Sequence, residues 1–539
     1  MFASVSRCVA SFGAGRCPCP RRRISSRFRA DFRGFLRLCG GQEQGARRSP
    51  AKRVRWEEET QRNERVFAAF GRNEGYGACA DEKQDKNFKT VARAPVFLRD
   101  RLSGTVQIRT VGGSVPSLQY PSPHSILQSR LKCGIIAHGK DVRIILLKKI
   151  YCRMFQACFG LGARVLPWRR PEAVTGAGSF RRLPDLLQKY GARRPLVVAS
   201  RRQCADPAFR QVLDRLEGYA LYTGVTPDPP VAEAEAIAAL YRAEHCDGFV
   251  AVGGGSPMDA AKAAAALLAR PHRTLAQMAG LLKVRRPIPP FIAVPTTAGT
   301  GSETTIAAVV TGADHHKYAV SDLCLIPRCA VLDPLLTVSL PPHTTAETGM
   351  DALTHAVEAY LGRFYPIRET NRLAEQAVVT IFQTLEHACA HGDDVAARQA
   401  LLTASCQAGF AFTRAGVGNV HAIAHTLGGL YGVGHGLANA VLLPVVLRDY
   451  GPAAHRKLAR LAELVGLTGD SEADRANAFI DAISAMERRL GIPTGFTCIQ
   501  EQDLPRMAAW AAAEANPTYP VPVIYDRARF IRVIRQVMQ

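Results

Sequence analysis

The sequence predicts two folded domains, an α/β domain with a parallel sheet and then an all-helical domain, after a long basic extension. From Leu196 onward, short β-rich runs alternate with Ala-rich amphipathic helices, which is typical of a parallel sheet covered on both faces. From about residue 343, the β signals fade and helical patterns such as residues 368–390 follow one another. We expect residues 1–153 to be a disordered or non-native extension. The α/β domain is expected over residues 154–340, and the helical domain over residues 341–539.

The positive charge of the chain is concentrated in residues 1–153. They contain 31 Lys and Arg against 12 Asp and Glu, so they carry +19 of the total of +23. The total is therefore no sign of nucleic-acid binding by the folded part. Three origins are open for this segment: translated upstream sequence, an Arg- and Ser-rich targeting extension, or a folded domain. Its one strand-like run is residues 141–150, and we expect a chain beginning at Met154 to fold and function like the whole chain.

Cysteine use and hydropathy bear on the compartment. No run of about 18 apolar residues occurs, so the sequence predicts no membrane span. The 8 cysteines that follow Met154 are scattered and include no CxxC pair, which is typical of reduced thiols. We therefore expect a cytoplasmic protein, with organelle targeting by the extension as the alternative.

The α/β elements follow in order along the chain. Strands are predicted over residues 196–200 and 248–256, and helices over residues 231–246 and 257–269. Residues 220–230 are predicted to be a strand that runs into a Pro-closed loop, and residues 290–302 a strand followed by a loop of small residues. One strand ends in GGGSPMD (Gly253–Asp259) and the next in PTTAGTGSETT (Pro295–Thr305). Glycines let backbone N–H groups approach an anion, and the helix that follows directs its positive end to the same place. The two loops together therefore predict a pyrophosphate site, although a Gly run alone is more often a simple turn.

A second cluster of chemistry-bearing residues lies in the helical half. Asp351 and His355 are four residues apart in a predicted helix and share one face, as do His421 and His425. Glycines after His425 should end that helix, so that His435 comes from a turn folding back toward His421. A carboxylate with imidazoles and no thiolate suits Fe²⁺, Zn²⁺ or Ni²⁺. The alternative is a set of packed core histidines, but three of them within a short Gly-rich and apolar segment favour a metal site.

These motifs resemble the iron-containing (group III) alcohol dehydrogenases. The resemblance rests on four stretches in the same order, GGGSPMDAAKA, PTTAGTGSE, LDPLLTVSLPPHTTAETGMDALTHAVEAY and HAIAHTLGGLYGVGHGLANAVLLP. It covers most of residues 154–539 and nothing in residues 1–153. It implies a fold similar to that of dehydroquinate synthase, with a nucleotide-binding α/β domain and a helical metal-binding domain.

The resemblance also implies roles for individual residues. The implied metal ligands are Asp351, His355, His421 and His435. His425 would lie near the nicotinamide and the substrate, beside the metal without binding it, and we expect it to be the catalytic residue that relays the hydroxyl proton. Contacts to an NAD or NADP cofactor would come from Gly254, Gly255, Ser256, Asp259, Thr296, Thr297, Thr305, Lys317 and Leu336.

Ser200, at the end of the first strand, departs from the pattern of the NAD-preferring members. They carry an Asp there, which binds the ribose hydroxyls and repels a 2′-phosphate. In this chain Ser200 is followed by Arg201 and Arg202, which would not repel one. We therefore expect NADP to be accepted at least as well as NAD, with Ser200 among the cofactor-binding residues.

The expected activity is the interconversion of an alcohol and an aldehyde or ketone by hydride transfer. The expected cofactors are Fe²⁺, with Zn²⁺ or another divalent metal as alternatives, and NAD or NADP. Three other activities stay open: a hydroxyacid–oxoacid transhydrogenase, another ketone reductase, and a dehydroquinate synthase-like lyase. An Arg or Lys in the substrate pocket would favour an acid substrate. The resemblance implies a homodimer or higher homo-oligomer, and neither a nucleic acid nor a membrane is an expected partner.

Overall fold

The computed structural model describes residues 146–313 and 316–539, and what we expect of residues 1–145 lies outside this part of the chain. A helix over residues 146–163 comes first and crosses the boundary expected between residues 153 and 154. The predicted strand over residues 141–150 is wrong for its described part, because residues 146–150 are helical. The buried positions of this helix recur at helical spacing, and they are Cys152, Gln156, Gly160 and Ala163.

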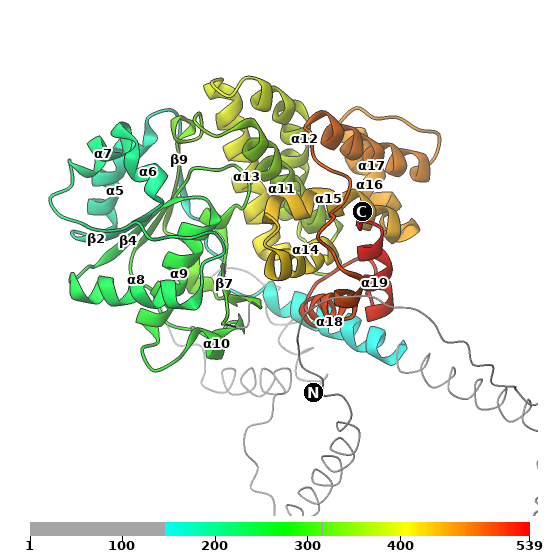
Figure 1. Ribbon diagram of the computed structural model, residues 1–539, viewed down its shortest axis with the longest axis horizontal. Helices are drawn as coiled ribbons and strands as arrows, with labels where there is room; N and C mark the ends of the chain where they lie inside the picture. Colours follow the sequence, from blue (N-terminus) through cyan, green and yellow to red (C-terminus); the bar gives the residue numbers. More distant parts are fainter. Residues whose placement is uncertain (1–145, 314–315) are drawn as a thin grey trace, which may run out of the picture. The chain divides into compact units, whose positions relative to one another are not determined.

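A six-stranded parallel sheet forms the centre of the α/β half (Figure 1). Its strands, in spatial order, are β1 (Glu172–Thr175), β9 (Cys329–Leu332), β6 (Phe291–Pro295), β4 (Gly248–Gly253), β2 (Pro195–Ala199) and β3 (Ala220–Tyr222). Every neighbouring pair is parallel. A smaller sheet joins β5 (Gly280–Leu281), β8 (Lys317–Ser321) and β7 (Ala307–Thr311). The predicted parallel sheet is therefore confirmed.

Helices cover both faces of the large sheet. Alternate residues of a strand point to opposite faces, so Val250 packs in one buried cluster and Phe249 in the other. One face is covered by α5 (Leu183–Tyr190) and α7 (Pro207–Leu213), with the short α6 (Arg201–Ala205) beside them, and the other by α8 (Val231–Ala243) and α9 (Gly255–Ala269) (Figure 1). The short helix α10 spans Leu275–Met278. The carboxyl ends of β4 and β6 carry the two predicted phosphate loops, so both loops lie at one sheet edge.

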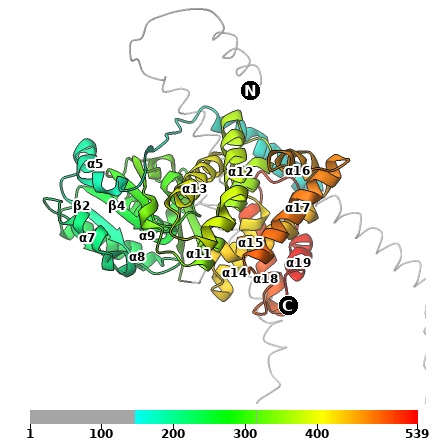
Figure 2. The same ribbon diagram turned by 90° about the horizontal axis from the view of Figure 1, so that it is seen from above.

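The second half is entirely helical, as predicted. Its helices are α11 (Pro342–Leu361), α12 (Arg368–Ala390), α13 (Val395–Ala415), α14 (Asn419–Tyr431), α15 (His435–Tyr450), α16 (Pro452–Leu464), α17 (Glu472–Arg489), α18 (Leu504–Ala515) and α19 (Arg527–Arg535). Figure 2 shows this group beside the sheet-bearing half. Among the residues that the structure describes, every helix is too short or too polar to cross a bilayer.

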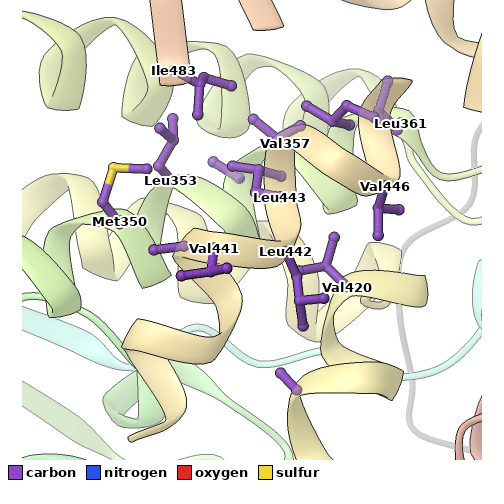
Figure 3. Close-up of a cluster of buried hydrophobic side chains, with 14 of the residues drawn as sticks. Met350, Leu353, Val357, Leu361, Val420, Val441, Leu442, Leu443, Val446 and Ile483 are labelled. Atoms are coloured by element: carbon purple, nitrogen blue, oxygen red, sulfur yellow. The ribbon is translucent and has the colours of Figure 1, made fainter. Parts of the chain in front are cut away.

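Helix α11 lies at the centre of the helical half. Every residue from Gly349 to Leu361 is buried, including polar residues such as Asp351 and His355, so this part of the helix is surrounded by other parts of the protein. Figure 3 shows Met350, Leu353 and Val357 of α11 against side chains of α15 and α17. The packing fixes α11 on several sides, so polar groups on this helix are held rigidly.

Candidate metal centre and nucleotide cavity

Three helices bring the predicted metal-binding side chains together. Asp351 and His355 lie one turn apart on α11, His421 lies in the first turn of α14, and His435 is the first residue of α15. One ligand atom from each of the four lies within 4.8 Å of the others. Asp351, His355 and His421 are buried, and His435 is partly exposed. The site is thus closed on one side and open on the other.

The backbone between the histidines differs from the prediction. Gly428 and Gly429 lie inside α14, which ends only at Gly432 in a left-handed conformation (φ 66°). His435 therefore comes from the start of the next helix and not from a turn. A Cβ at position 428 would lie 2.6 Å from Nζ of Lys317, so glycine here leaves room for the end of this lysine side chain.

Glu358, one turn beyond His355 on α11, positions His421. Its carboxylate accepts hydrogen bonds from the backbone N–H groups of Gly418 (2.7 Å) and Val420 (2.8 Å), and thereby caps α14. Nδ1 of His421 lies 2.6 Å from the same carboxylate. A Cβ at position 418 would lie 2.5 Å from Glu358 Oε1, so this close approach needs glycine. Burial raises the pKa of Glu358 to about 7, although these hydrogen bonds oppose the shift.

The imidazoles of this cluster are in the state that metal binding requires. Burial lowers the pKa of His355 and, more strongly, that of His421, and it lowers the pKa of His435 to about 4. Neutral rings offer lone pairs, which are what a metal ion binds. Among the described residues, Nδ1 of His355 is buried and has no hydrogen-bond partner. The donor set and the unpartnered nitrogen fit a divalent metal ion.

Asn439, one turn beyond His435 on α15, reaches into the same cluster. Its Nδ2 lies 2.7 Å from Asp351 Oδ1, 3.2 Å from His421 Nε2 and 3.1 Å from His435 Nε2. These three atoms thus converge on one point from three helices.

A cavity of about 330 Å³ joins this cluster to the phosphate loops. The predicted site residues in its lining are Gly255, Ser256, Asp259, Thr305, Lys317, His355, His421, His425 and His435. Gly255 begins α9, so the positive end of this helix faces the cavity. The other predicted cofactor residues are not in this lining, and they are Ser200, Gly254, Thr296, Thr297 and Leu336. Leu336 instead packs in the core between the sheet and α5.

Asp259 and Thr305 belong to a buried network around Lys262. Oδ1 of Asp259 accepts from the Ser302 hydroxyl at 2.7 Å. Nζ of Lys262 lies 2.8 Å from Thr305 Oγ1 and also donates to the carbonyls of Ser302, Thr305 and Ala307. Burial lowers the pKa of Lys262 to about 8. This network fixes the loop after β6 against α9, so it sets the shape of the cavity at its nucleotide end.

His425 has a carboxylate partner that the sequence did not reveal. Its Nδ1 lies 2.6 Å from Glu514 of α18, and Glu514 also accepts a hydrogen bond of 2.5 Å from the Tyr519 hydroxyl. Burial lowers the pKa of His425, but the charge and hydrogen bond of Glu514 outweigh it and raise the pKa overall. His425 stacks on His435 at 5.2 Å between ring centroids.

Ser200 stands at the N-terminus of α6. Its hydroxyl accepts a hydrogen bond from the backbone N–H of Gln203 at 3.2 Å, so it caps this helix. Nη2 of Arg202 donates to the Ser339 carbonyl at 2.5 Å. The side chain of Arg201 is exposed. The Ser339 carbonyl therefore binds Arg202 and not Arg201.

Fold and site together define a class: a parallel-sheet domain with a Gly-rich loop faces a helical domain with a carboxylate–imidazole cluster. Residues 171–334 match the family described as iron-containing alcohol dehydrogenase, and residues 345–538 match the C-terminal part of the Fe-containing alcohol dehydrogenase family. The chain belongs to the iron-containing alcohol dehydrogenase family.

Individual relatives agree with this assignment. The chain is 40% identical over 358 residues to 1,3-propanediol dehydrogenase of Klebsiella pneumoniae, covering 64% of this chain and 90% of that protein. It is 34% identical over 376 residues to the NAD-dependent methanol dehydrogenase of Bacillus methanolicus, covering 67% of this chain and 97% of the relative. A crystal structure of 1,3-propanediol oxidoreductase superposes with a TM-score of 0.66 at 36% identity, covering 69% of this chain and all (100%) of that one.

Proposed function

We propose that this protein is a metal- and NAD(P)-dependent alcohol dehydrogenase, which interconverts an alcohol and an aldehyde or ketone. One observation carries the proposal: the cluster of Asp351, His355, His421 and His435 opens into the cavity that reaches Gly255 at the start of α9. A metal ion and a dinucleotide bound at its two ends would meet inside one space. The lyase alternative has no such support, since the named relatives above are dehydrogenases or oxidoreductases.

The residues of the cluster would hold a divalent metal, which acts as a Lewis acid on an alcohol oxygen when it is bound. Fe²⁺ is the proposed ion, because the relatives' family is described as iron-containing and the donor set suits it. A nicotinamide cofactor would supply the hydride acceptor. Phe412 stacks on His355 at 4.1 Å between ring centroids and lines the cavity. It thereby helps to exclude water from this side of the cluster.

His425 is the proposed proton relay. Its Nδ1 is held by Glu514, so Nε2 is the ring nitrogen left for a proton from the substrate hydroxyl. The Glu514 carboxylate stabilises the imidazolium that then forms. Because His425 lines the cavity beside His435, it stands where such a proton is released.

The proposed function is tested with the purified full chain, reconstituted with Fe²⁺ under anaerobic conditions. The oxidation of primary and secondary alcohols is monitored through the formation of NADH or NADPH. Turnover that needs both the metal and a dinucleotide is the expected result. A fully metal-loaded protein that turns over no alcohol, aldehyde or hydroxy acid with either cofactor would refute the proposal.

A second candidate, an enzyme acting on hydroxy or oxo acids, is favoured by Arg414 in the cavity lining. Its guanidinium lies over Trp168, 5.5 Å from the ring centroid. No carboxylate of the described residues forms an ion pair with it, and Arg164 adds a second positive charge nearby. An anionic end group of a substrate would supply the missing partner. If so, Arg414→Ala lowers kcat/KM for a hydroxy acid at least about tenfold relative to an uncharged alcohol of equal length, and Arg414→Lys lowers it less.

The remaining expectations stay proposals. We infer that NADP is used alongside NAD, since Ser200 replaces an acidic residue and Arg201 lies exposed next to it. A cytoplasmic location is proposed on the free cysteines, which in the described residues include the buried Cys152, Cys246 and Cys329. A homodimer or higher homo-oligomer is proposed from the family alone.

A further inference from the structure

We propose that the helix over residues 146–163 is a working part of the active site, in which Phe159 determines the size of the substrate and Gln156 positions the loop behind His425. This inference rests on the proposed function. The helix lies outside both ranges that match the family, the first of which begins at residue 171. Nothing in the family assignment therefore gives it a role.

The helix is bound to the loop over residues 516–525, which connects α18 to α19. Arg153 donates from Nη1 to the Val521 carbonyl and from Nη2 to the Pro522 carbonyl, both at 2.7 Å. Gln156 is fully buried, and its Nε2 donates to the carbonyls of Pro517 (3.1 Å) and Tyr519 (2.7 Å). Buried carbonyls without a donor are costly, so these bonds tie the loop to the helix.

Apolar packing reinforces the same contact. Cys152 is buried in a small cluster with Val521 and Ile524 of the loop. Farther along the helix, a Cβ on Gly160 would lie 2.7 Å from the Phe364 carbonyl oxygen, so glycine is needed for this close approach. The helix therefore contacts the protein along its length through a face made of small and polar residues. A chain beginning at Met154 would lack both Cys152 and Arg153.

The loop leads directly to the proton relay. Tyr519 donates through its hydroxyl to Glu514, which holds His425. The same Tyr519 supplies the carbonyl that Gln156 binds. At the other end of the loop, the Val523 carbonyl accepts from Nδ2 of Asn419, the first residue of α14. A shift of this loop would thus disturb the bond from Tyr519 to Glu514, the partner of His425, and would also disturb the start of the helix that carries His425.

The helix also supplies part of the cavity wall. Phe159 lines the cavity, and its ring centroid lies 5.1 Å from that of Tyr365, which lines it too. The Tyr365 hydroxyl donates to the Thr518 carbonyl at 2.9 Å, so this wall is joined to the loop. The phenyl ring of Phe159 is the largest group that the helix places in the cavity, and its removal would open space for a bulkier substrate.

Selectivity between two substrates tests the role of Phe159. The ratio of kcat/KM for a branched or aromatic primary alcohol to that for ethanol is measured in the full chain. Phe159→Ala should raise this ratio at least about tenfold, and Phe159→Trp should lower it. The ratio is independent of the fraction of folded enzyme, so a loss of stability cannot imitate the result. An unchanged ratio in both variants would overturn the assignment.

Hydrogen exchange tests the role of Gln156. Gln156→Ala should speed exchange in residues 516–525 and lower kcat by roughly 10- to 100-fold while the KM for the cofactor stays the same. The matched control is Leu161→Ala, since Leu161 lies on the same helix and is 64% exposed. Exchange that is equal in both variants would refute the bracing role. This readout needs no turnover, so it separates a failure of this inference from a failure of the proposed function.

Discussion

Nδ1 of His421 lies 2.6 Å from the carboxylate of Glu358, and both side chains are buried. The contact leaves Nε2 of His421 directed toward Asn439 and the other members of the cluster. A carboxylate behind a histidine fixes the ring orientation and raises its strength as a ligand. Glu358 therefore matters to the metal site without being one of the four groups that we propose to bind it.

Glu358→Gln should weaken the affinity for the metal by about 10- to 100-fold, because the amide orients the ring less firmly and carries no charge. The protein competes with a metal chelator for the ion, and the amount of metal that stays bound to the protein is measured. Glu487→Gln is the matched control, since Glu487 is also a buried glutamate but belongs to α17. Equal metal affinities in the two variants would show that Glu358 has no such role.

Ser200→Asp should shift the preference between cofactors toward NAD. Aspartate is as good a helix cap as serine, so α6 should remain intact. Its charge would repel the 2′-phosphate of NADP, and the ratio of kcat/KM for NAD to that for NADP should rise at least about tenfold. Arg201→Ala should change the ratio in the same direction. A wild-type enzyme that ignores NADP, together with a neutral Ser200→Asp, would place adenosine recognition elsewhere.

Lys262→Met should destabilise the protein and impair cofactor binding together. Lys262 is fully buried, and its removal leaves the carbonyls of Ser302, Thr305 and Ala307 without their donor. We expect a loss of at least about 2 kcal/mol in the free energy of unfolding, measured with urea, and a higher KM for the cofactor. The control is Lys283→Met at an exposed position. Unchanged stability would mean that the network does not hold the loop.

Glu487 should make stability depend on pH. Burial raises its pKa to about 8, against the charges of Arg448 and Arg488, and within the described residues its Oε1 has no hydrogen-bond partner. The folded state then keeps a proton that the unfolded state has already released above about pH 4.5. Its contribution to stability is fully present below that pH and is lost as the pH rises through about 8.

The variant Glu487→Gln removes this proton. Its melting temperature, compared with that of the wild type, should therefore be relatively higher at about pH 8.5 than at about pH 5.5. A difference between the two proteins that is the same at both pH values would contradict the assignment of this proton to Glu487.

The parts of the site that follow local periodicity could be predicted from the sequence. Spacing alone put Asp351 and His355 on one helix face and His421 and His425 on another, because a helix fixes such neighbours locally. Glu358 lies one turn beyond His355 on α11, so this signal was available for it too. Asn439 lies four residues after His435 on α15, but the sequence placed His435 in a turn, so no shared helix face was predicted for this pair. Glu514 could not be found this way, because it meets His425 only through the tertiary packing of α18.

The helix over residues 146–163 was missed for a different reason. Its buried positions are occupied by Cys152, Gln156, Gly160 and Ala163, whereas Met154 and Leu161 are exposed. The usual apolar stripe of a helix is thus absent. Its contacts are mainly hydrogen bonds to carbonyls in a loop about 360 residues later in the chain, which no local pattern reveals.

The metal content of three variants tests the central claim most directly. After anaerobic loading with Fe²⁺ and desalting, elemental analysis gives the metal bound per chain. We expect wild type, His425→Ala and the exposed-site control His272→Ala to retain about one ion each, and His421→Ala to lose it along with nearly all turnover. His425→Ala should keep its metal but turn over slowly. A His421→Ala protein that retains stoichiometric metal and full activity would contradict the assignment of this cluster as the metal centre.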